Sequence, residues 1–440
     1  ADIVQVGSAY YAFTGSHTLT IDSTTGNAYA QYLSVDNSGI HSITMNQTGG
    51  ALSTSAHEYI GSSGTGSYTQ SGGLHDVAGI LYLGYNAGSN GSYTLSGSGS
   101  VSAGNERIGY NGTGSFIQSG GTHSVTTSLE LGAFSTANGS YDLINGNLTT
   151  YQERIGNYGV GNFTQSGGTH DVTYNLYLGT KSGSSGTYNL DGGTLSVVGN
   201  IFTGDGSSAI NIDGGTLSVG GGNGSIEAEF FRLGYDTGTS GSHTLSGTGS
   251  LTTFAQHIGE YGTGTFTQSG GSNSATWFYV GLFPTGVGSY DLTNGGLATT
   301  YQFIGQLGSG SFTQSGGSNT TQDLTLGDST DGDGSYDLSG TGSLIADYVY
   351  IGDYGTGSFT QSGGTHDVAN NLYLGYNTTG DGSYNLGGTG SLTVTGAEFI
   401  GVDGAGSFTQ NGGTHDVANS FHLGLNSTSS GSYELINGCL

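Results

Sequence analysis

The octapeptide GSFTQSGG occupies residues 310–317 and returns unchanged at residues 357–364. Five further copies, each differing from it at one position, lie at 66–73, 114–121, 161–168, 264–271 and 406–413. A shorter relative, GSY followed by one residue and Leu, lies at 91–95, 139–143, 288–292, 334–338, 382–386 and 431–435. Such self-similarity at a fixed period is the sequence signature of a repeat architecture.

The two kinds of repeat alternate with a period of about 24 residues, and an apolar residue followed by Gly precedes each of them. One period holds three short strand-like segments, such as LYLG from Leu81, SYTL from Ser92 and SVSA from Ser100, separated by Gly-rich corners. Short strands with corners in one uniform spacing predict an all-β protein, a single parallel β-solenoid of about 18 turns with three short strands per turn.

The repeats cover nearly the whole chain without a linker or a change of composition. We expect residues 1–57 to form two divergent N-terminal solenoid turns, through GSHTL at residue 15 and HSITM at residue 41. Residues 58–440 then form the regular solenoid, with one irregular turn at 199–230 that has no aromatic residue at the usual position. The expected organisation is one continuous domain.

Stacking the turns places equivalent residues above one another, about 4.8 Å apart. The aromatic residue of each repeat then forms a ladder: Tyr68, Tyr93, Phe116, Tyr141, Phe163, Tyr188, Phe266, Tyr290, Phe312, Tyr336, Phe359, Tyr384, Phe408 and Tyr433. Two residues further on, alternate turns carry a glutamine: Gln70, Gln118, Gln165, Gln268, Gln314, Gln361 and Gln410. The sequence does not decide whether this face is interior, although a buried glutamine amide needs backbone partners.

Composition excludes several classes of function. The 440 residues include 90 Gly, only four Lys or Arg, and a formal net charge of −27. Nucleic acid is not an expected partner, because neutralising phosphates requires basic side chains. No apolar run reaches the roughly 18 residues of a membrane-spanning helix. The single cysteine suits an exported protein.

The repeat pattern, an apolar residue and Gly followed by Gly-Ser/Thr-aromatic-Thr-Gln-Ser-Gly-Gly, resembles the Gly-rich repeats associated with type V secretion and PEP-CTERM proteins. The resemblance covers roughly residues 55–440. It implies an exported β-solenoid at the bacterial cell surface, and it implies no enzymatic activity.

Candidate chemistry is sparse. Solenoid enzymes that act on polysaccharides use long, basic loops, whereas these corners are short and no basic residue follows Arg232. His-Asp pairs such as His75-Asp76 recur, and we interpret them as a polar corner repeated with the unit. No cofactor is required. A calcium ion is possible at one corner, where three carboxylates have oxygen-ligand spacing: Asp328, Asp331 and Asp333.

We therefore expect an extracellular structural protein, without catalysis, that assembles head to tail into a filament or surface fibre. The alternatives are a monomeric adhesin or passenger rod that binds a surface glycan or another cell-surface ligand, and, as a minor option, a polysaccharide-active enzyme. Head-to-tail joining is expected because Leu440 of one subunit, followed by Ala1 of the next subunit, would continue the repeat in the same phase. The expected junction comprises Ala1, Asp2, Ile3, Val4, Val6, Gly7, Leu435, Gly438, Cys439 and Leu440.

Overall fold

The structure is a computed structural model, and it describes residues 2–6, 9–13, 17–25, 27–36 and 43–439. It confirms an all-β protein built as a parallel β-solenoid, with about 17 turns of roughly 24 residues each. Contacts within the chain group it into two compact units: unit 1 comprises residues 1–210 and 215–229, and unit 2 comprises residues 211–214 and 230–440. The boundary between these units falls inside the irregular turn.

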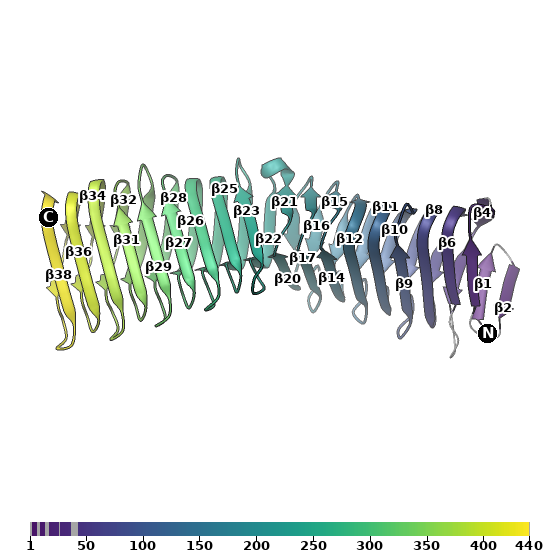
Figure 1. Cartoon of the computed structure of the whole chain (residues 1–440), viewed down its shortest axis with the longest axis horizontal. Helices are drawn as coiled ribbons and strands as arrows, with labels where there is room; N and C mark the ends of the chain where they lie inside the picture. The colour runs from purple at the N-terminus through teal and green to yellow at the C-terminus, as the bar shows by residue number, and fades with distance from the viewer. Residues whose placement is uncertain (1, 7–8, 14–16, 26, 37–42, 440) are drawn as a thin grey trace. The chain divides into compact units, whose positions relative to one another are not determined.

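Figure 1 shows the strands of each unit running side by side. The strands of unit 1 are β1 (Asp2–Val6), β2 (Ala9–Phe13), β3 (His17–Ile21), β4 (Asn27–Ala30), β5 (Leu33–Asp36), β6 (Ile43–Thr54), β7 (Glu58–Ile60), β8 (Thr65–Leu83), β9 (Asn90–Leu95), β10 (Ser100–Ile108), β11 (Thr113–Leu131), β12 (Asn138–Thr150), β13 (Glu153–Ile155), β14 (Val160–Gln165), β15 (Thr169–Val172), β16 (Leu176–Leu178), β17 (Ser185–Leu190), β18 (Thr194–Val197), β19 (Ile201–Thr203) and β21 (Thr216–Val219).

Two strands contribute residues to both units, β20 (Ser207–Ile212) and β22 (Ser225–Leu233). The strands of unit 2 are β23 (Ser240–Leu245), β24 (Ser250–Ile258), β25 (Thr263–Val280), β26 (Val287–Ile304), β27 (Ser309–Gln314), β28 (Ser318–Leu326), β29 (Asp333–Leu338), β30 (Ser343–Ile351), β31 (Thr356–Gln361), β32 (Thr365–Val368), β33 (Leu372–Leu374), β34 (Asp381–Val394), β35 (Glu398–Ile400), β36 (Ala405–Val417), β37 (Phe421–Leu423) and β38 (Ser430–Cys439).

The turn formed by β14, β15 and β16 shows the design. Its first strand pairs in parallel with β12 and β17, its second with β12 and β18, and its third with β13 and β19. The pairing aligns equivalent residues of successive turns, so that Phe163 lies between Tyr141 and Tyr188. Along each strand, buried residues alternate with more exposed ones, as expected for a strand with one face in a core. Some of the longer strands, such as β11, run through two or three of these strand positions.

The Gly that follows each apolar residue at the end of the third strand is required by the backbone. Gly305 has a φ of +69°, a conformation that side-chain-bearing residues rarely adopt, and a Cβ atom there would lie 2.1 Å from the carbonyl oxygen of Asp333. The chain therefore turns its corner against the backbone of the following turn, where no side chain fits.

The irregular turn keeps the solenoid pairing but changes two features. Ile210 is buried in the strand that carries an aromatic residue in other turns. A short 3-10 helix, η1 (Gly220–Gly222), lengthens the corner after β21.

The N-terminal segment differs from the expectation. Two parallel turns are present, because β3 and β4 pair with β6 and β5 pairs with β7. Residues Asp2–Val6, however, do not continue the parallel repeat: β1 runs antiparallel to both β2 and β5. The hairpin occupies an edge of β5 that would otherwise leave backbone groups unpaired. The prediction that this segment presents a phase-matched parallel strand to another subunit is therefore wrong.

Candidate functional site

The predicted aromatic ladder lies in the interior of both units. In unit 1 the ring centroids from Tyr68 to Tyr188 are 4.7–4.8 Å apart in successive turns, with interplanar angles of 3–6°. In unit 2 the rings from Phe266 to Tyr433 are 4.6–5.0 Å apart. All of these side chains are at most 1% exposed, except Tyr433 in the last turn. The structure thus shows that the ladder face is interior, a point that the sequence left open.

The glutamines of the ladder are buried and fully hydrogen-bonded. The Nε2 atom of Gln118 donates to the carbonyl oxygens of Gly121, at 3.3 Å, and Asn147, at 3.1 Å. Its Oε1 atom accepts from the Tyr141 hydroxyl at 2.5 Å. The same three bonds recur at Gln70, Gln165, Gln268, Gln314, Gln361 and Gln410. The backbone thus supplies the partners that a buried amide requires.

The recurring histidines also lie inside, on second strands, and not in corners as the sequence suggested. The Nε2 atom of His123 lies 2.8 Å from Oε2 of Glu106, and both side chains are fully buried. Its Nδ1 atom lies 2.9 Å from the Tyr141 hydroxyl oxygen. Equivalent Glu–His contacts of 2.7–3.0 Å join Glu58 to His75, Glu153 to His170 and Glu398 to His415. The residues that follow these histidines, Asp76, Ser124, Asp171 and Asp416, point to the outer face.

The hydrogen-bond partners fix where the protons of each pair lie. The Gln118 amide is oriented by its two bonds to carbonyls, so its Oε1 accepts the Tyr141 proton. The Nδ1 atom of His123 must then donate to the Tyr141 oxygen, which leaves Nε2 facing Glu106. In the equivalent pairs of Glu58 with His75 and of Glu398 with His415, the Nε2–Oε2 contacts of 2.8 and 2.7 Å are hydrogen bonds, and each needs one shared proton. Each of these two pairs therefore carries no net charge, which suits a dry interior.

Two turns of unit 2 replace the pair by amides and support this assignment. Asn273 and Asn319 take the place of histidine and donate from Nδ2 to the hydroxyl oxygens of Tyr290, at 3.0 Å, and Tyr336, at 3.1 Å. Asn319 also donates to Oε1 of Gln302 at 3.1 Å. Burial raises the pKa of the ladder tyrosines, including Tyr290, so their hydroxyls keep the proton that they donate.

The turn of His366 lacks the acidic partner. Val349 occupies the position that glutamate takes 17 residues before the other histidines. The Nδ1 atom of His366 lies 3.1 Å from the Tyr384 hydroxyl, while Nε2 has no partner. Burial lowers the pKa of His366 to about 3, because a charged imidazole would be desolvated without compensation.

This turn predicts a specific acid sensitivity. In the unfolded chain His366 has an ordinary pKa near 6.5, so below that pH the unfolded state binds one more proton than the folded state. Between pH 6.5 and about 3, the folded state should lose about 1.4 kcal/mol of stability per pH unit through this group. Urea unfolding followed at pH 7, 6 and 5 measures this loss, and His366→Asn, which copies Asn319, should reduce the pH slope. Equal slopes for both proteins would contradict the burial of a neutral imidazole.

Within the described residues, the three carboxylates of the acidic corner are not gathered into one ligand group. Asp328 is half-buried and its pKa is raised by burial and lowered in part by hydrogen bonds with Gln306 and Ser329. Asp331 and Asp333 are exposed in the corner. Among the residues that the structure describes, no group of three or more His, Cys, Asp or Glu side chains is placed to hold a metal ion.

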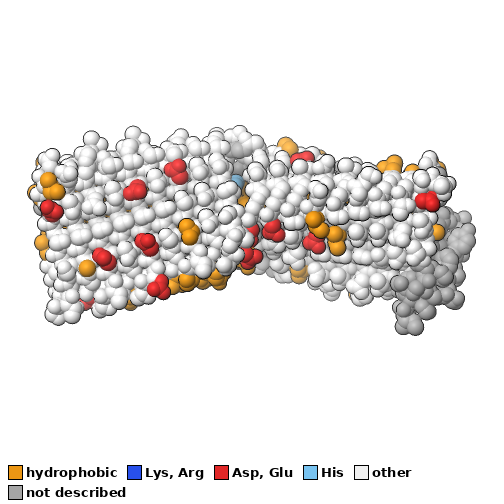
Figure 2. Space-filling model, viewed as in Figure 1, with side chains coloured by type: hydrophobic (Ala, Val, Ile, Leu, Met, Phe, Trp, Pro, Cys, Tyr) orange, Lys and Arg blue, Asp and Glu red, His pale blue; other side chains and the backbone are white. Residues whose placement is uncertain are grey.

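The outer surface carries aromatic side chains and few cations. Arg107 and Arg154 both approach Glu130, with nitrogen–oxygen distances of 3.4 and 3.9 Å, and each guanidinium lies over a tyrosine ring. Arg232 pairs in the same way with Glu260 at 3.0 Å. Figure 2 shows one face of the molecule, where acidic side chains are scattered among uncharged ones. Three of the four basic side chains are thus engaged within the protein, and an anionic ligand finds little attraction.

The predicted junction residues lie in different surroundings. Leu435 is 51% exposed in β38, and Cys439 is a free, exposed cysteine. Gly438 has a positive φ in the same strand. Asp2, Ile3, Val4 and Val6 belong to the antiparallel strand β1. Ala1, Gly7 and Leu440 lie outside the described residues.

The glutamates of the buried pairs were missed by sequence reasoning, although a signal exists. Each lies 17 residues before its partner: Glu precedes His75, His123, His170 and His415 at this spacing, whereas Gln256 and Gln302 precede Asn273 and Asn319, and His366 is preceded by Val349. Comparison with protein-family models, curated proteins and solved structures finds no match for this chain. In its described part, no helix has the length and apolar character needed to cross a membrane.

Proposed function

We propose that this protein is an extracellular structural protein of a bacterial surface or matrix, that it performs no catalysis, and that its copies assemble end to end. The observation that carries the proposal is the burial of the side chains that could act as acids or bases. The side chains best suited to acid–base catalysis, such as Glu58 and His75, are fully buried, and the hydrogen bonds of His75 to Glu58 and Tyr93 join neighbouring turns. Side chains that no substrate can reach support a structural role better than a catalytic one. No cofactor is part of this proposal.

End-to-end assembly is supported by the last turn of unit 2. Leu423 and Leu435 are 49% and 51% exposed, whereas the equivalent Leu374 and Leu386 of an earlier turn are 0% and 2% exposed. The most complementary cover for this parallel, apolar face is another turn of the same kind. Among the described strands, β3 and β4 pair only with β6, so their opposite edges in a second copy of the chain are open to the first and second strand positions of this turn, whereas β1 covers the corresponding edge of β5.

Electron microscopy of the purified chain, combined with sedimentation velocity, tests this proposal. We expect filaments or end-joined oligomers from the 440-residue protein. Replacing Leu423 and Leu435 together by Glu should leave folded single molecules, because two carboxylates would have to be desolvated at the joint. Asn385→Glu adds a charge on the exposed outer face of β34 and serves as the control. Filaments that persist in the double variant would show lateral association instead.

A further inference from the structure

The third strands at the two ends of the repeat array differ in how far they are covered. In the last turn of unit 2, Phe421 and Leu423 of β37 are 36% and 49% exposed. In the first turn of unit 1, Leu33 and Val35 hold the same positions on the third strand, β5, and are 1% and 0% exposed. Strand β5 is thus buried like a strand inside the solenoid, although the next solenoid turn, that of β7, covers only one of its sides.

Strand β1 lies along the other side of β5. It runs antiparallel to β5, with Ile3 opposite Asp36 and Val4 opposite Val35. Its second partner is β2, and the hairpin that these two strands form, the N-terminal hairpin, lies at the end of unit 1 (Figure 1). The edge that β1 occupies is the one that a further solenoid turn would use for its third strand.

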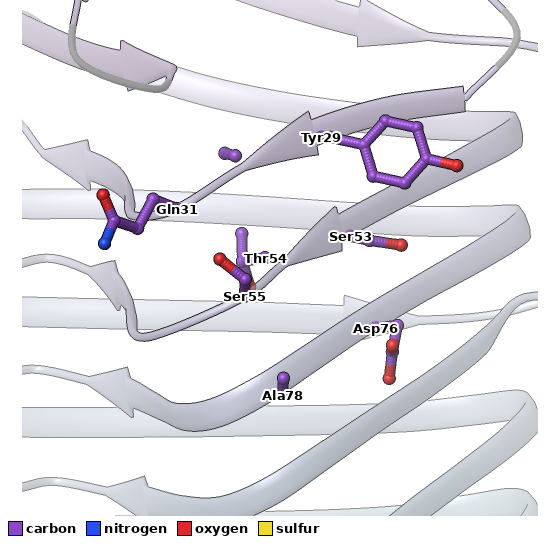
Figure 3. A pocket seen from close by; sticks show the side chains of 8 residues that line it. Tyr29, Gln31, Ser53, Thr54, Ser55, Asp76 and Ala78 are labelled. Atoms are coloured by element: carbon purple, nitrogen blue, oxygen red, sulfur yellow. The ribbon is translucent and has the colours of Figure 1, made fainter.

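The first and second strand positions of this turn remain open. Leu19 of β3 is 40% exposed, whereas Met45, its partner in the following turn, is 1% exposed. Strand β4 keeps the register of the repeat: Figure 3 shows Tyr29, Ser53 and Asp76, which pair in successive turns, one above another on the outer side. This end of unit 1 is therefore in register to receive another parallel turn, except where β1 lies.

Strand β1 covers β5 only in part. It pairs with β5 at Val35 and Asp36, whereas β7 pairs with all of Leu33–Val35. A parallel third strand such as β37, which pairs with β35 along the whole of Phe421–Leu423, would extend along all of β5. Backbone pairing of an added strand with a free edge is a common source of affinity between chains. A second copy of the chain therefore offers β5 a longer partner than β1 does.

The position of β5 does not depend on β1. The Asp36 carboxylate accepts hydrogen bonds from the backbone amides of Ser63 and Gly64, at 2.9 and 2.8 Å. The carbonyl oxygen of Val35 accepts another from the Gly61 amide at 2.8 Å. The following turn thus holds the end of β5 in place, so that β1 can leave without unravelling the first turn.

We propose that the N-terminal hairpin is a detachable cap, and that β37 of a second copy takes the place of β1 along β5 when two copies join. Two strands cannot pair with the same edge, so capping and joining exclude each other. The hairpin lowers the fraction of ends that can join, and it weakens the apparent affinity between copies in the same proportion. This inference rests on the end-to-end assembly proposed above and names the contact that controls it.

A reversible disulfide between the hairpin and β5 tests the need for detachment. The protein carries Val4→Cys and Val35→Cys, with Cys439→Ser to remove the native thiol. Directly opposed residues of antiparallel strands have Cα atoms about 4.5–5.5 Å apart, within the range that a disulfide spans. The oxidised protein should remain single in sedimentation velocity and electron microscopy, and reduction should restore filaments. The reduced protein is the matched control, and circular dichroism of both forms checks that the solenoid is folded.

Weakening the cap should have the opposite effect. In Ile3→Pro with Val4→Pro, one of the two lost amides faced β5, because neighbouring residues of a strand point their N–H groups to opposite sides. Filaments should form at a protein concentration about tenfold lower, the factor expected when one or two backbone hydrogen bonds of the cap are lost. Ile3→Val with Val4→Ile keeps β-branched residues and should assemble like the parent protein.

Leu423→Glu with Leu435→Glu, added to the proline variant, should abolish its filaments, because the uncapped end must still meet the last turn of unit 2. Filaments that survive this change would show unspecific pairing of a freed edge and overturn the cap. Equal assembly of the oxidised and reduced proteins, or of the proline variant and the parent, would also overturn it but leave end-to-end assembly standing. Absence of filaments from every variant would contradict end-to-end assembly itself, and the cap with it.

Discussion

Replacement of Phe312 by Ala is expected to lower the local free energy of unfolding by about 3–5 kcal/mol, the usual cost of truncating a buried phenylalanine. Phe312 is 1% exposed, and its ring stacks between Tyr290 at 4.8 Å and Tyr336 at 4.6 Å. The alanine would leave a cavity between two rings that the paired backbones hold in place, so the neighbouring turns can close it only in part.

Hydrogen exchange of the backbone amides in β26, β27 and β29 measures this loss, because each turn contacts only its neighbours and opens locally. Thr313→Ala is the control: Thr313 is the next residue on the same strand and faces outward. It should change the local free energy by less than about 0.5 kcal/mol. A loss of less than about 1 kcal/mol for Phe312→Ala would show that the aromatic ladder does not hold the turns together.

The solenoid itself could be predicted because the sequence motifs that indicate it recur in almost every turn. GSFTQSGG and its five variants fix the period, and the apolar-Gly pairs fix one corner of every turn. The inward face could not be derived from the same pattern. Ladder positions alternate between apolar residues such as Leu338 and polar ones such as Gln314, and these two lie in register on adjacent strands. Only the backbone carbonyls around Gln314 show why an amide is tolerated there.

The buried pairs were less accessible to sequence reasoning, because their members are on different strands. Glu106 is in β10, whereas His123 is in β11, and nothing local to either residue reveals the contact. The N-terminal hairpin was missed for another reason. Asp2–Val6 contains Ile3, Val4 and Val6, residue types that also form the solenoid strands, and such a composition does not encode strand direction.

The pair of Glu106 and His123 should show how much of this interior depends on matched polar groups. His123→Leu is expected to cost about 3–5 kcal/mol locally, since it leaves the Glu106 carboxyl buried without its partner. Leucine itself fits the position, because Leu148 and Val101 lie beside His123 in the adjacent turns. The loss of stability would therefore come from the buried Glu106 carboxyl without a partner and from the lost stacking of His123 on Phe116 at 4.6 Å.

The double variant Glu106→Val with His123→Leu separates these two contributions. Val349 already occupies the glutamate position in another turn, so both replacements are residues that this solenoid accepts. With no acid left to desolvate, the double variant should recover most of the loss and lie within about 1.5 kcal/mol of the parent protein. Exchange of the amides in β10 and β11 measures both variants. If the double variant is less stable than His123→Leu, Glu106 contributes through contacts other than its histidine. A recovery would mean that the pair serves chiefly to match one buried group with another, and that its acid and base are structural partners.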